Sequence, residues 1–347
     1  MRYEVSKFGM VQNIPPLLLD WWKNLSHSDK NHVKRVLGNL PSLLDIRPNN
    51  TLIEVATMFW DEKRVVFRFG DVEMTPLLEE IGGFARLPWD SPGLSVPENR
   101  TPPRFLKMTG FKKNDELLCL KKSYIPFEFL YECYGHSKSY RLHHDELVVT
   151  FLGWTHRRVF VFIICFLGLL IFPKKRGKIH TRLAMVAKTP MEGIEGQTYT
   201  IIPMILAEMY RALDRCKQGY GHFGGCNLLL QVWLLEYFQR GEYQQELLRR
   251  PLNDYIAYHH PKRMTFIPDR FVQPGSAVSW VRFFSNLTDE KVHWIFEWFP
   301  SSEFIIWSRE ITYLMLTGLR GIYPYAPIRV MRQAGRKQVI PRFSNMV

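Results

Sequence analysis

The stretch VFVFIICFLGLLIFPKKRGK, residues 159–178, decides how the rest of the chain is interpreted. It begins with fourteen apolar residues, Val159–Phe172, and continues with Pro173 and four basic residues. A helix of fourteen residues is about 21 Å long, whereas the hydrocarbon core of a bilayer is about 30 Å thick. Arg157 and Arg158 precede the apolar run, so a longer span would place charges near the bilayer centre. The stretch therefore predicts a core helix ended by Pro173, and no membrane span.

The composition is that of a folded globular protein. Hydrophobic residues make up 46% of the 347 residues and aromatic residues 14%, which is enough to bury a large core. The five cysteines are an odd number without the tight spacing of a disulfide framework, which favours a reducing compartment. The first residues, MRYEVSKFGMVQNIPP, lack the apolar segment of a secretion signal. We expect a soluble protein that is not secreted.

Apolar periodicity predicts a mainly α (α+β) fold, a single compact helical domain with short strands or hairpins near 64–70 and 176–183. Further helices are expected over four segments, namely 14–25, 50–60 (capped by Asn50 or Thr51), 201–218 and 226–238. The last segment has no polar face, which indicates nearly complete burial.

Two segments between these helices carry turn signals. Residues 74–83 predict a short helix, with Thr75 as its cap and Gly82–Gly83 as its end. Residues 88–114 hold five prolines, which favour an exposed loop or a small hairpin region.

The formal net charge is +13, and residues 151–200 and 301–347 together carry 11 of the excess positive charges. Such clustering is typical of a surface that meets nucleic acid or another polyanion. The candidate phosphate contacts are Lys174, Lys175, Arg176 and Lys178 in the first window, and Arg329, Arg332, Arg336 and Lys337 in the second. In the alternative interpretation these are solvated charges, and Arg329 and Arg332 pair with acidic residues of 61–80 such as Asp71 or Glu73.

No catalytic, metal or cofactor motif is found. The chain has no nucleophile elbow, P-loop, HExxH or GxGxxG pattern. Cys216, His222 and Cys226 do not have the spacing of a zinc site. The acidic residues of 61–80 include Glu79 and Glu80, which stabilise the first turn of a helix in any case. We therefore predict no catalytic residue, no metal and no cofactor.

The basic run PKKRGK, residues 173–178, matches the short pattern of a nuclear import signal. A polar turn after a buried helix accounts for the same residues. The import interpretation predicts a nuclear location and requires the segment to be exposed.

Three stretches in fixed order carry a family resemblance. The first is Trp60 followed by VFRFGDVEMTPLLEEIGGFARLP, and the second is FIICFLGLLIFPKKRGKIH. The third is YAPIRVMRQAGRKQVIP at 325–341. Together they resemble the plant mobile domain family, also labelled aminotransferase-like. That family has a Trp, then an F-x-[FL] strand and a G-E-[MC]-T-x-T-L-[EQ]-D-V segment, and it closes with R-V-[ML]-R-Q. The residues that match the first motif are Phe67, Phe69, Glu73, Met74, Thr75, Leu78, Glu79 and Pro88.

The departures from the motif are Leu77, Glu80 and Ala334, together with GGFARLP in place of L-x-G-L-P. They make the chain look more like the uncharacterised plant domain found in retroelement-derived reading frames, a divergent branch of the same superfamily. The resemblance implies a core over 50–341, an N-terminal helical extension over 1–49 packed on it, and a tail over 342–347. It also implies nuclear roles in transposon silencing, gene-expression control and genome stability. It brings no catalytic residues, and nothing in the sequence supports pyridoxal phosphate.

The leading hypothesis is a non-enzymatic nuclear domain of transposon-related origin that binds DNA, RNA or chromatin and silencing partners. A second hypothesis is a protein-interaction scaffold, which an exposed apolar patch beside 88–114 would favour. A third is an uncharacterised enzyme, which a deep pocket with an acidic residue of 61–80 would favour.

Overall fold

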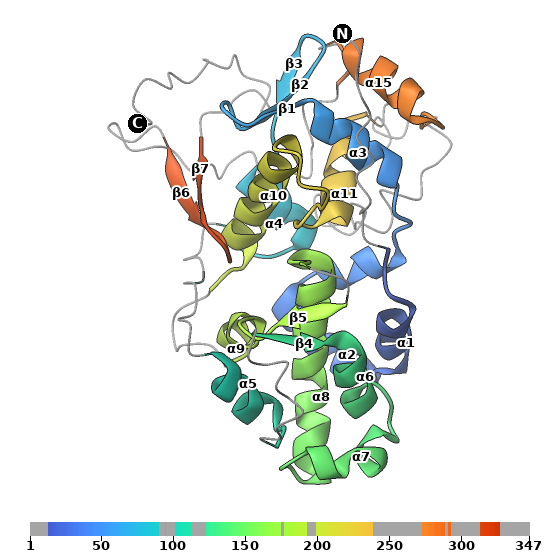
Figure 1. Cartoon of the computed structure of the whole chain (residues 1–347), viewed down its shortest axis with the longest axis vertical. Helices are drawn as coiled ribbons and strands as arrows, with labels where there is room; N and C mark the ends of the chain where they lie inside the picture. Colours follow the sequence, from blue (N-terminus) through green and yellow to red (C-terminus); the bar gives the residue numbers. More distant parts are fainter. Residues whose placement is uncertain are drawn as a thin grey trace, which may run out of the picture.

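The computed structural model describes residues 13–89, 94, 101–112, 123–174, 177–192, 199–238, 273–288, 291–292 and 313–326. These residues form a mainly α fold with a few small antiparallel strand pairs, as the sequence predicts. Figure 1 shows helices and one pair of strands in the lower half, and helices with the other two small sheets in the upper half.

The central element is helix α8, Phe151–Phe166, which continues through the π-helical turn η4, Leu167–Ile171. Residues 159–173 are all buried, and Pro173 follows the end of the helix. By length and composition Phe151–Ile171 qualifies as a membrane-crossing helix, but 78% of its most apolar part is buried inside the protein. This burial agrees with the core helix that the sequence predicts.

Shorter elements surround α8 in the lower half of Figure 1. Helices α2, α6 and α9 pack directly against α8, and α5 contacts both α8 and α9. Strands β4 and β5 form an antiparallel pair with Ile125 opposite Ile179. The bounds of these elements are α1 Pro16–Asn24, α2 His27–Leu37, η1 Leu40–Asp45, α5 Thr101–Thr109, β4 Tyr124–Pro126, α6 Phe127–Tyr134, α7 Ser139–Leu142, η3 His144–Glu146, β5 Lys178–His180 and α9 Leu183–Glu192.

In the upper half, helices α10 and α11 lie beside a three-stranded meander of order β1-β2-β3. Phe67 and Phe69 of β2 are buried while Arg68 between them is exposed, the alternation expected of a half-buried strand. Every residue of α11 is buried, as its sequence predicts. The bounds are α3 Asn50–Met58, β1 Trp60–Asp61, β2 Val66–Phe69, β3 Val72–Met74, α4 Leu78–Ala85, α10 Ile202–Lys217, α11 Asn227–Phe238, α15 Ala277–Ser285, β6 Leu314–Thr317 and β7 Ile322–Tyr325.

One continuous core links the two halves. It takes Leu18 and Trp21 from α1, Phe162 from α8, Trp233 from α11 and Tyr325 from β7. The first two helices therefore contribute to the same core as the rest of the described chain.

Several local predictions about helix ends need correction. The short helix begins at Leu78 rather than near Thr75, because Leu77 is extended (φ −110°, ψ 157°) and its amide donates a hydrogen bond to the Glu80 side chain at 2.9 Å. The Tyr210 hydroxyl donates to the Pro76 carbonyl at 2.6 Å in the segment before the helix. Gly82 and Gly83 lie inside α4, which ends at Arg86 with a left-handed φ of 50°. Helix α3 is capped by Asn49, whose side chain accepts from the Leu52 amide, and not by either of its next two residues.

Two further corrections concern longer segments. Residues 88–114 contain helix α5, because prolines suit the first turn of a helix and Phe105 anchors its inner face in the core. The strand expected near 176–183 exists as β5, but it pairs with β4, more than fifty residues earlier, and not within a local hairpin.

Candidate anion-binding site

Two of the eight predicted phosphate contacts lie in the described part of the chain. Lys174 and Lys178 are both exposed, the first after η4 and the second on β5. The Lys174 ammonium lies 4.6 Å from the centre of the Tyr124 ring, a cation–π contact within the protein. The other six lie outside the described residues, namely Lys175, Arg176, Arg329, Arg332, Arg336 and Lys337.

The residues of the first family motif build the core rather than a site. Seven of them are buried, namely Trp60, Phe67, Phe69, Met74, Thr75, Leu78 and Glu79. The Trp60 indole donates a hydrogen bond to Asp214 at 2.7 Å. The rings of Phe67 and Phe69 stack with their centres 5.3 Å apart.

Two acidic residues of 61–80, Asp61 and Glu73, pair with neighbouring arginines. Glu73, which is half-buried on β3, pairs with Arg64 at 2.9 Å and with Arg68 at 3.4 Å. Arg68 also approaches Asp61 at 3.8 Å. These local pairs hold the meander together, and the alternative partners Arg329 and Arg332 lie outside the described residues.

The Glu80 carboxyl is fully buried in the upper half. It accepts hydrogen bonds from the Leu77 amide at 2.9 Å, the Trp233 indole at 2.7 Å and the Tyr237 hydroxyl. Burial raises the pKa of Glu80 to about 8, because the hydrogen bonds only partly offset the loss of hydration. Glu80 thus ties the start of α4 to α11.

A second buried carboxylate, Glu208 on α10, is held by two arginines. Arg211 contacts it at 2.8 Å and Arg320, in the β6–β7 turn, at 3.6 Å. The Arg320 amide also donates to Glu208 at 2.7 Å, and its guanidinium donates to the carbonyls of Phe172 and Pro173. This cluster joins α10, the β6–β7 hairpin and the end of the central helix.

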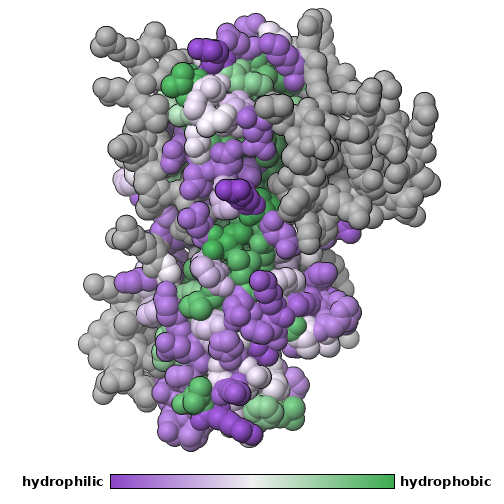
Figure 2. All heavy atoms as spheres, turned by 90° about the vertical axis from the view of Figure 1, so that its right-hand side faces the viewer, coloured by the Kyte–Doolittle hydropathy of each residue, from purple (hydrophilic) through white to green (hydrophobic). Residues whose placement is uncertain are grey.

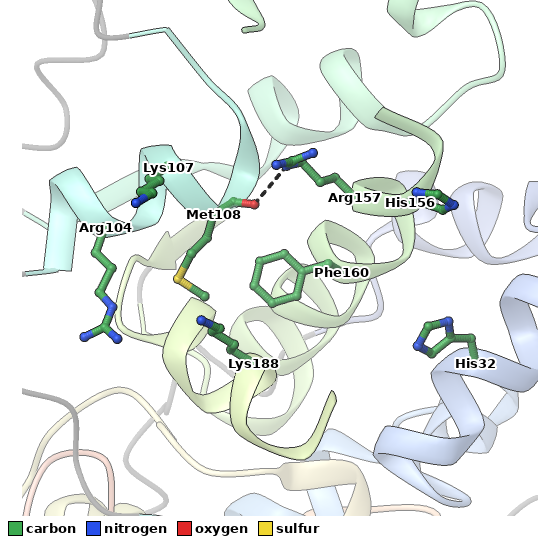
Figure 3. Close-up of a pocket in the computed structure, with 8 residues that line it drawn as sticks. All are labelled: His32, Arg104, Lys107, Met108, His156, Arg157, Phe160 and Lys188. Atoms are coloured by element: carbon green, nitrogen blue, oxygen red, sulfur yellow. Dashed lines mark hydrogen bonds between the residues drawn. The ribbon is translucent and has the colours of Figure 1, made fainter. Parts of the chain in front are cut away.

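The lower half contains the opposite arrangement, a cavity of about 610 Å³ lined by basic groups. Figure 3 shows the side chains of α5 on one side, those of α2 on the other and Phe160 of α8 between them. We call it the basic cavity; the described residues that line it are His32, Arg104, Lys107, Met108, His156, Arg157, Phe160 and Lys188. No Asp or Glu is among these lining residues.

Helical spacing explains how these side chains converge. Lys107 and Met108 follow Arg104 by three and four positions on α5, so both lie on the same side of that helix as Arg104. The same spacing brings His156 and Phe160 together on α8. Four helices that contact one another therefore supply a ring of cations around an apolar floor.

The Arg157 side chain is fixed in place by backbone carbonyls. Its Nε donates to the Met108 carbonyl at 3.2 Å and its Nη1 to the Gly153 carbonyl at 3.2 Å. Gly110 allows this close approach, because its φ is 82° and a Cβ there would lie 3.2 Å from Arg157 Cδ and 2.6 Å from Val149 Cγ1. One guanidinium of the basic cavity is thus pre-oriented at the end of α5.

The other cations of α5 have no partner of opposite charge in the described part of the chain. Arg104 and Lys107 are exposed, and neither forms an ion pair with a described carboxylate. Cations that converge without counter-charges attract an anion, and phosphate is an anion that both arginine and lysine bind well. Among the described residues no group of His, Cys, Asp or Glu is placed to hold a metal ion.

Sequence reasoning missed the basic cavity because its cations are scattered along the chain. Arg104 and Lys107 lie in the segment expected to be a loop, and Lys188 lies well beyond the basic run at 173–178. The signal that was present is the motif TPPRFLKMT, in which prolines start a helix and two cations share one face.

A smaller basic cluster lies around Tyr124, where the predicted Lys174 is found. The rings of Tyr124 and His180 pack edge to face with centres 4.7 Å apart. Burial and the nearby charges of Arg182, Lys174 and Arg320 lower the pKa of His180 to about 4. The basic cavity gathers more cationic side chains, from four helices, and is the stronger candidate.

An exposed apolar patch lies at the lower end of the molecule. Its members are Leu142, Val148, Phe151 and Leu152, whose exposed fractions range from 55% to 75%. Figure 2 shows hydrophobic surface at this end, where Figure 1 places α7 and the start of α8. The Val148 amide bonds to the Gly110 carbonyl at 2.9 Å, so this apolar patch adjoins the end of 88–114.

Comparison with known proteins gives one match. The model of a family described as a domain of unknown function (DUF7745) matches residues 18–340. No curated protein and no solved structure matches the chain.

Proposed function

Since the chain belongs to the DUF7745 family, whose members have no established function, we propose a function from the structure: the protein binds nucleic acid through the phosphate backbone. The basic cavity is the principal contact. The exposed Lys174 and Lys178 extend the contact along the strand, with affinity that depends on phosphates rather than on base sequence.

One observation carries this proposal. The basic cavity brings together four Lys and Arg residues and two histidines from four helices, with no acidic side chain among its described lining residues. Elsewhere in the described chain, the buried Arg211 and the half-buried Arg320 are paired with a carboxylate, that of Glu208. Backbone phosphates supply negative charge to Arg104 and Lys107, which pair with no described carboxylate, and their neutralisation releases counterions.

The proposed setting is the nucleus. It is supported by the import-like run at 173–178 and by the resemblance of three stretches to the plant mobile domain family. We further propose that the family is a divergent, transposon-related branch of that superfamily and that chromatin is the physiological target.

The import signal is tested by fusing residues 173–178 to a fluorescent protein. The fusion accumulates in nuclei if the run is an import signal, and a fusion spread evenly through the cell contradicts it.

Binding is tested by fluorescence anisotropy with labelled duplex DNA and single-stranded RNA at low salt. The variant Arg104→Glu/Lys107→Glu reverses two exposed cations of the basic cavity and loses at least about tenfold in affinity. The matched control is Lys63→Glu/Lys291→Glu, which makes the same charge change on exposed residues of the upper half and keeps most of the affinity.

A third variant, Lys174→Glu/Lys178→Glu, measures what the predicted basic run adds. If wild-type protein binds no nucleic acid at low salt, the proposed function is wrong. If the control loses as much affinity as the basic-cavity variant, binding depends on net charge alone and the assigned site is wrong.

The apolar patch supports a second candidate function, a protein-interaction scaffold. Leu142 and Leu152 are 75% and 67% exposed, so serine at both positions leaves folding intact. Wild-type protein and both variants are then cross-linked to their neighbours in nuclear extract. A scaffold partner is lost with Leu142→Ser/Leu152→Ser and retained with Arg104→Glu/Lys107→Glu. A set of cross-linked proteins that is identical in both variants contradicts the scaffold.

A further inference from the structure

The basic cavity is larger than a phosphate group requires, and its floor is apolar. Its volume of about 610 Å³ lies within the range of pockets that hold small organic ligands, about 300–1,000 Å³. Met108 and Phe160 form the floor between the cations of α5 and the histidines on the other side (Figure 3). A surface that contacts only a phosphate backbone needs cations and hydrogen-bond donors. The apolar floor therefore indicates a ligand that also has an apolar part.

The cations and the floor are arranged for one ligand with two kinds of surface. Arg157 is fixed by the Met108 and Gly153 carbonyls through Nε and Nη1, which leaves Nη2 to donate to a ligand. The Met108 carbonyl that holds Arg157 belongs to the same residue whose side chain lines the floor. A phosphate at Arg157 is therefore joined to a group that lies over Met108 and Phe160.

We propose that the basic cavity binds one unpaired nucleotide of a single strand, an inference that rests on the proposed nucleic-acid binding. The phosphate contacts Arg157 and the cations of α5, and the base lies against Met108 and Phe160. A base that is paired and stacked within a duplex cannot reach such a floor, whereas bases of single strands stack readily on side chains. The protein therefore prefers single strands to duplexes.

The test compares three labelled probes at one salt concentration: oligothymidylate, an abasic strand of the same length, and the matched duplex. Wild-type full-length protein binds oligothymidylate at least about fivefold tighter than the other two, because base contacts add to phosphate contacts. The variant Met108→Ala weakens binding of oligothymidylate about fivefold and leaves the abasic strand unchanged. Phe160→Leu keeps an apolar side chain, removes the ring and gives the same pattern.

Competition with free thymidine monophosphate tests whether the pocket recognises a base and a phosphate together, or a phosphate alone. Competition by thymidine monophosphate, without competition by deoxyribose phosphate at the same concentration, supports a pocket that recognises the base as well as the phosphate. Competition by both, or by neither, overturns that pocket.

Failure of this inference differs from failure of the proposed function. Equal affinities for oligothymidylate and the abasic strand, both abolished by Arg104→Glu/Lys107→Glu, overturn the base pocket and leave phosphate binding intact. Absence of binding by wild-type protein to every probe overturns both.

Discussion

The two halves of the molecule treat their charged groups in opposite ways. In the upper half Glu80 and Glu208 are buried, and each has several partners from distant parts of the chain. In the lower half Arg104 and Lys107 face a cavity and form no ion pair with a described carboxylate. The difference separates charges that hold the fold from charges that are free for a ligand.

The two halves differ because buried and exposed charges have different energetic costs. A buried ion must be hydrogen-bonded or paired, since loss of its hydration costs several kcal/mol. An exposed cation keeps its hydration, and an ion pair at the surface contributes little to stability. Substitutions in the upper half are therefore expected to change stability, and substitutions at the basic cavity to change binding.

The largest effect on stability is expected for Glu208→Ala. It leaves the buried guanidinium of Arg211 and the largely buried one of Arg320 without their carboxylate. Loss of one partner of a buried pair costs about 3–5 kcal/mol. Urea unfolding followed by tryptophan fluorescence measures the free energy of unfolding. The exposed Glu132 on α6 provides the control, and Glu132→Ala changes that free energy by less than about 0.5 kcal/mol. Equal effects of the two variants would contradict the structural role of Glu208.

The next largest effect is expected for Glu80→Ala. It leaves the Leu77 amide, the Trp233 indole and the Tyr237 hydroxyl without their shared acceptor. Unsatisfied buried donors cost about 1–3 kcal/mol each, and relaxation around alanine reduces the sum, so we expect a loss of about 2–3 kcal/mol. Glu80→Gln keeps the shape of the protonated carboxyl and is expected to lose less than half as much at pH 7.

The Glu80 site also makes stability depend on pH. Its pKa in the folded protein is about 8, against an ordinary value of 4.5, so the folded protein holds this proton more tightly than the unfolded chain. The free energy of unfolding therefore falls as the pH rises from about 4.5 to about 8, by at most about 1.4 kcal/mol per pH unit. In Glu80→Gln this part of the slope is absent. Parallel slopes for the wild-type and Gln proteins would show that Glu80 does not titrate in this range.

The smallest effect on stability is expected for Arg104→Glu/Lys107→Glu. Both side chains are exposed and have no described partner of opposite charge, so the free energy of unfolding changes by less than about 0.5 kcal/mol. The same urea titration checks it. A decrease of about 2 kcal/mol or more would mean that these cations stabilise the fold, and the contrast between the two halves would disappear.

Local patterns in the sequence were sufficient for much of the fold. The apolar run at 159–172 and the segment at 226–238, whose few polar residues share no face, are buried helices, as predicted, because burial on all sides leaves no polar face in the sequence. The predicted start of α4 was wrong: Leu77, just before the helix, is extended, and the segment that precedes it contacts the Tyr210 hydroxyl, which lies 134 residues away and donates to the Pro76 carbonyl. A propensity rule cannot include a contact over such a distance.

The basic cavity could not be predicted from local patterns, because its residues are also far apart in the sequence. His32, Lys107 and Lys188 carry no motif, and only the packing of α2, α5, α8 and α9 brings them together. The predicted cluster at Lys174 and Lys178 was visible because its residues lie in one short run of the chain. Continuous runs of charge can be predicted from sequence, whereas assembled ones require the fold.

The salt dependence of nucleic-acid binding tests the central claim most directly. The logarithm of the binding constant is measured against the logarithm of salt concentration for wild-type protein, Arg104→Glu/Lys107→Glu and the control Lys63→Glu/Lys291→Glu. If the cations of the basic cavity bind phosphates, the slope of the first variant is smaller than the wild-type slope by about 0.7–0.9 for each phosphate that it no longer neutralises, and the control keeps the wild-type slope. Equal slopes for all three proteins would contradict the account.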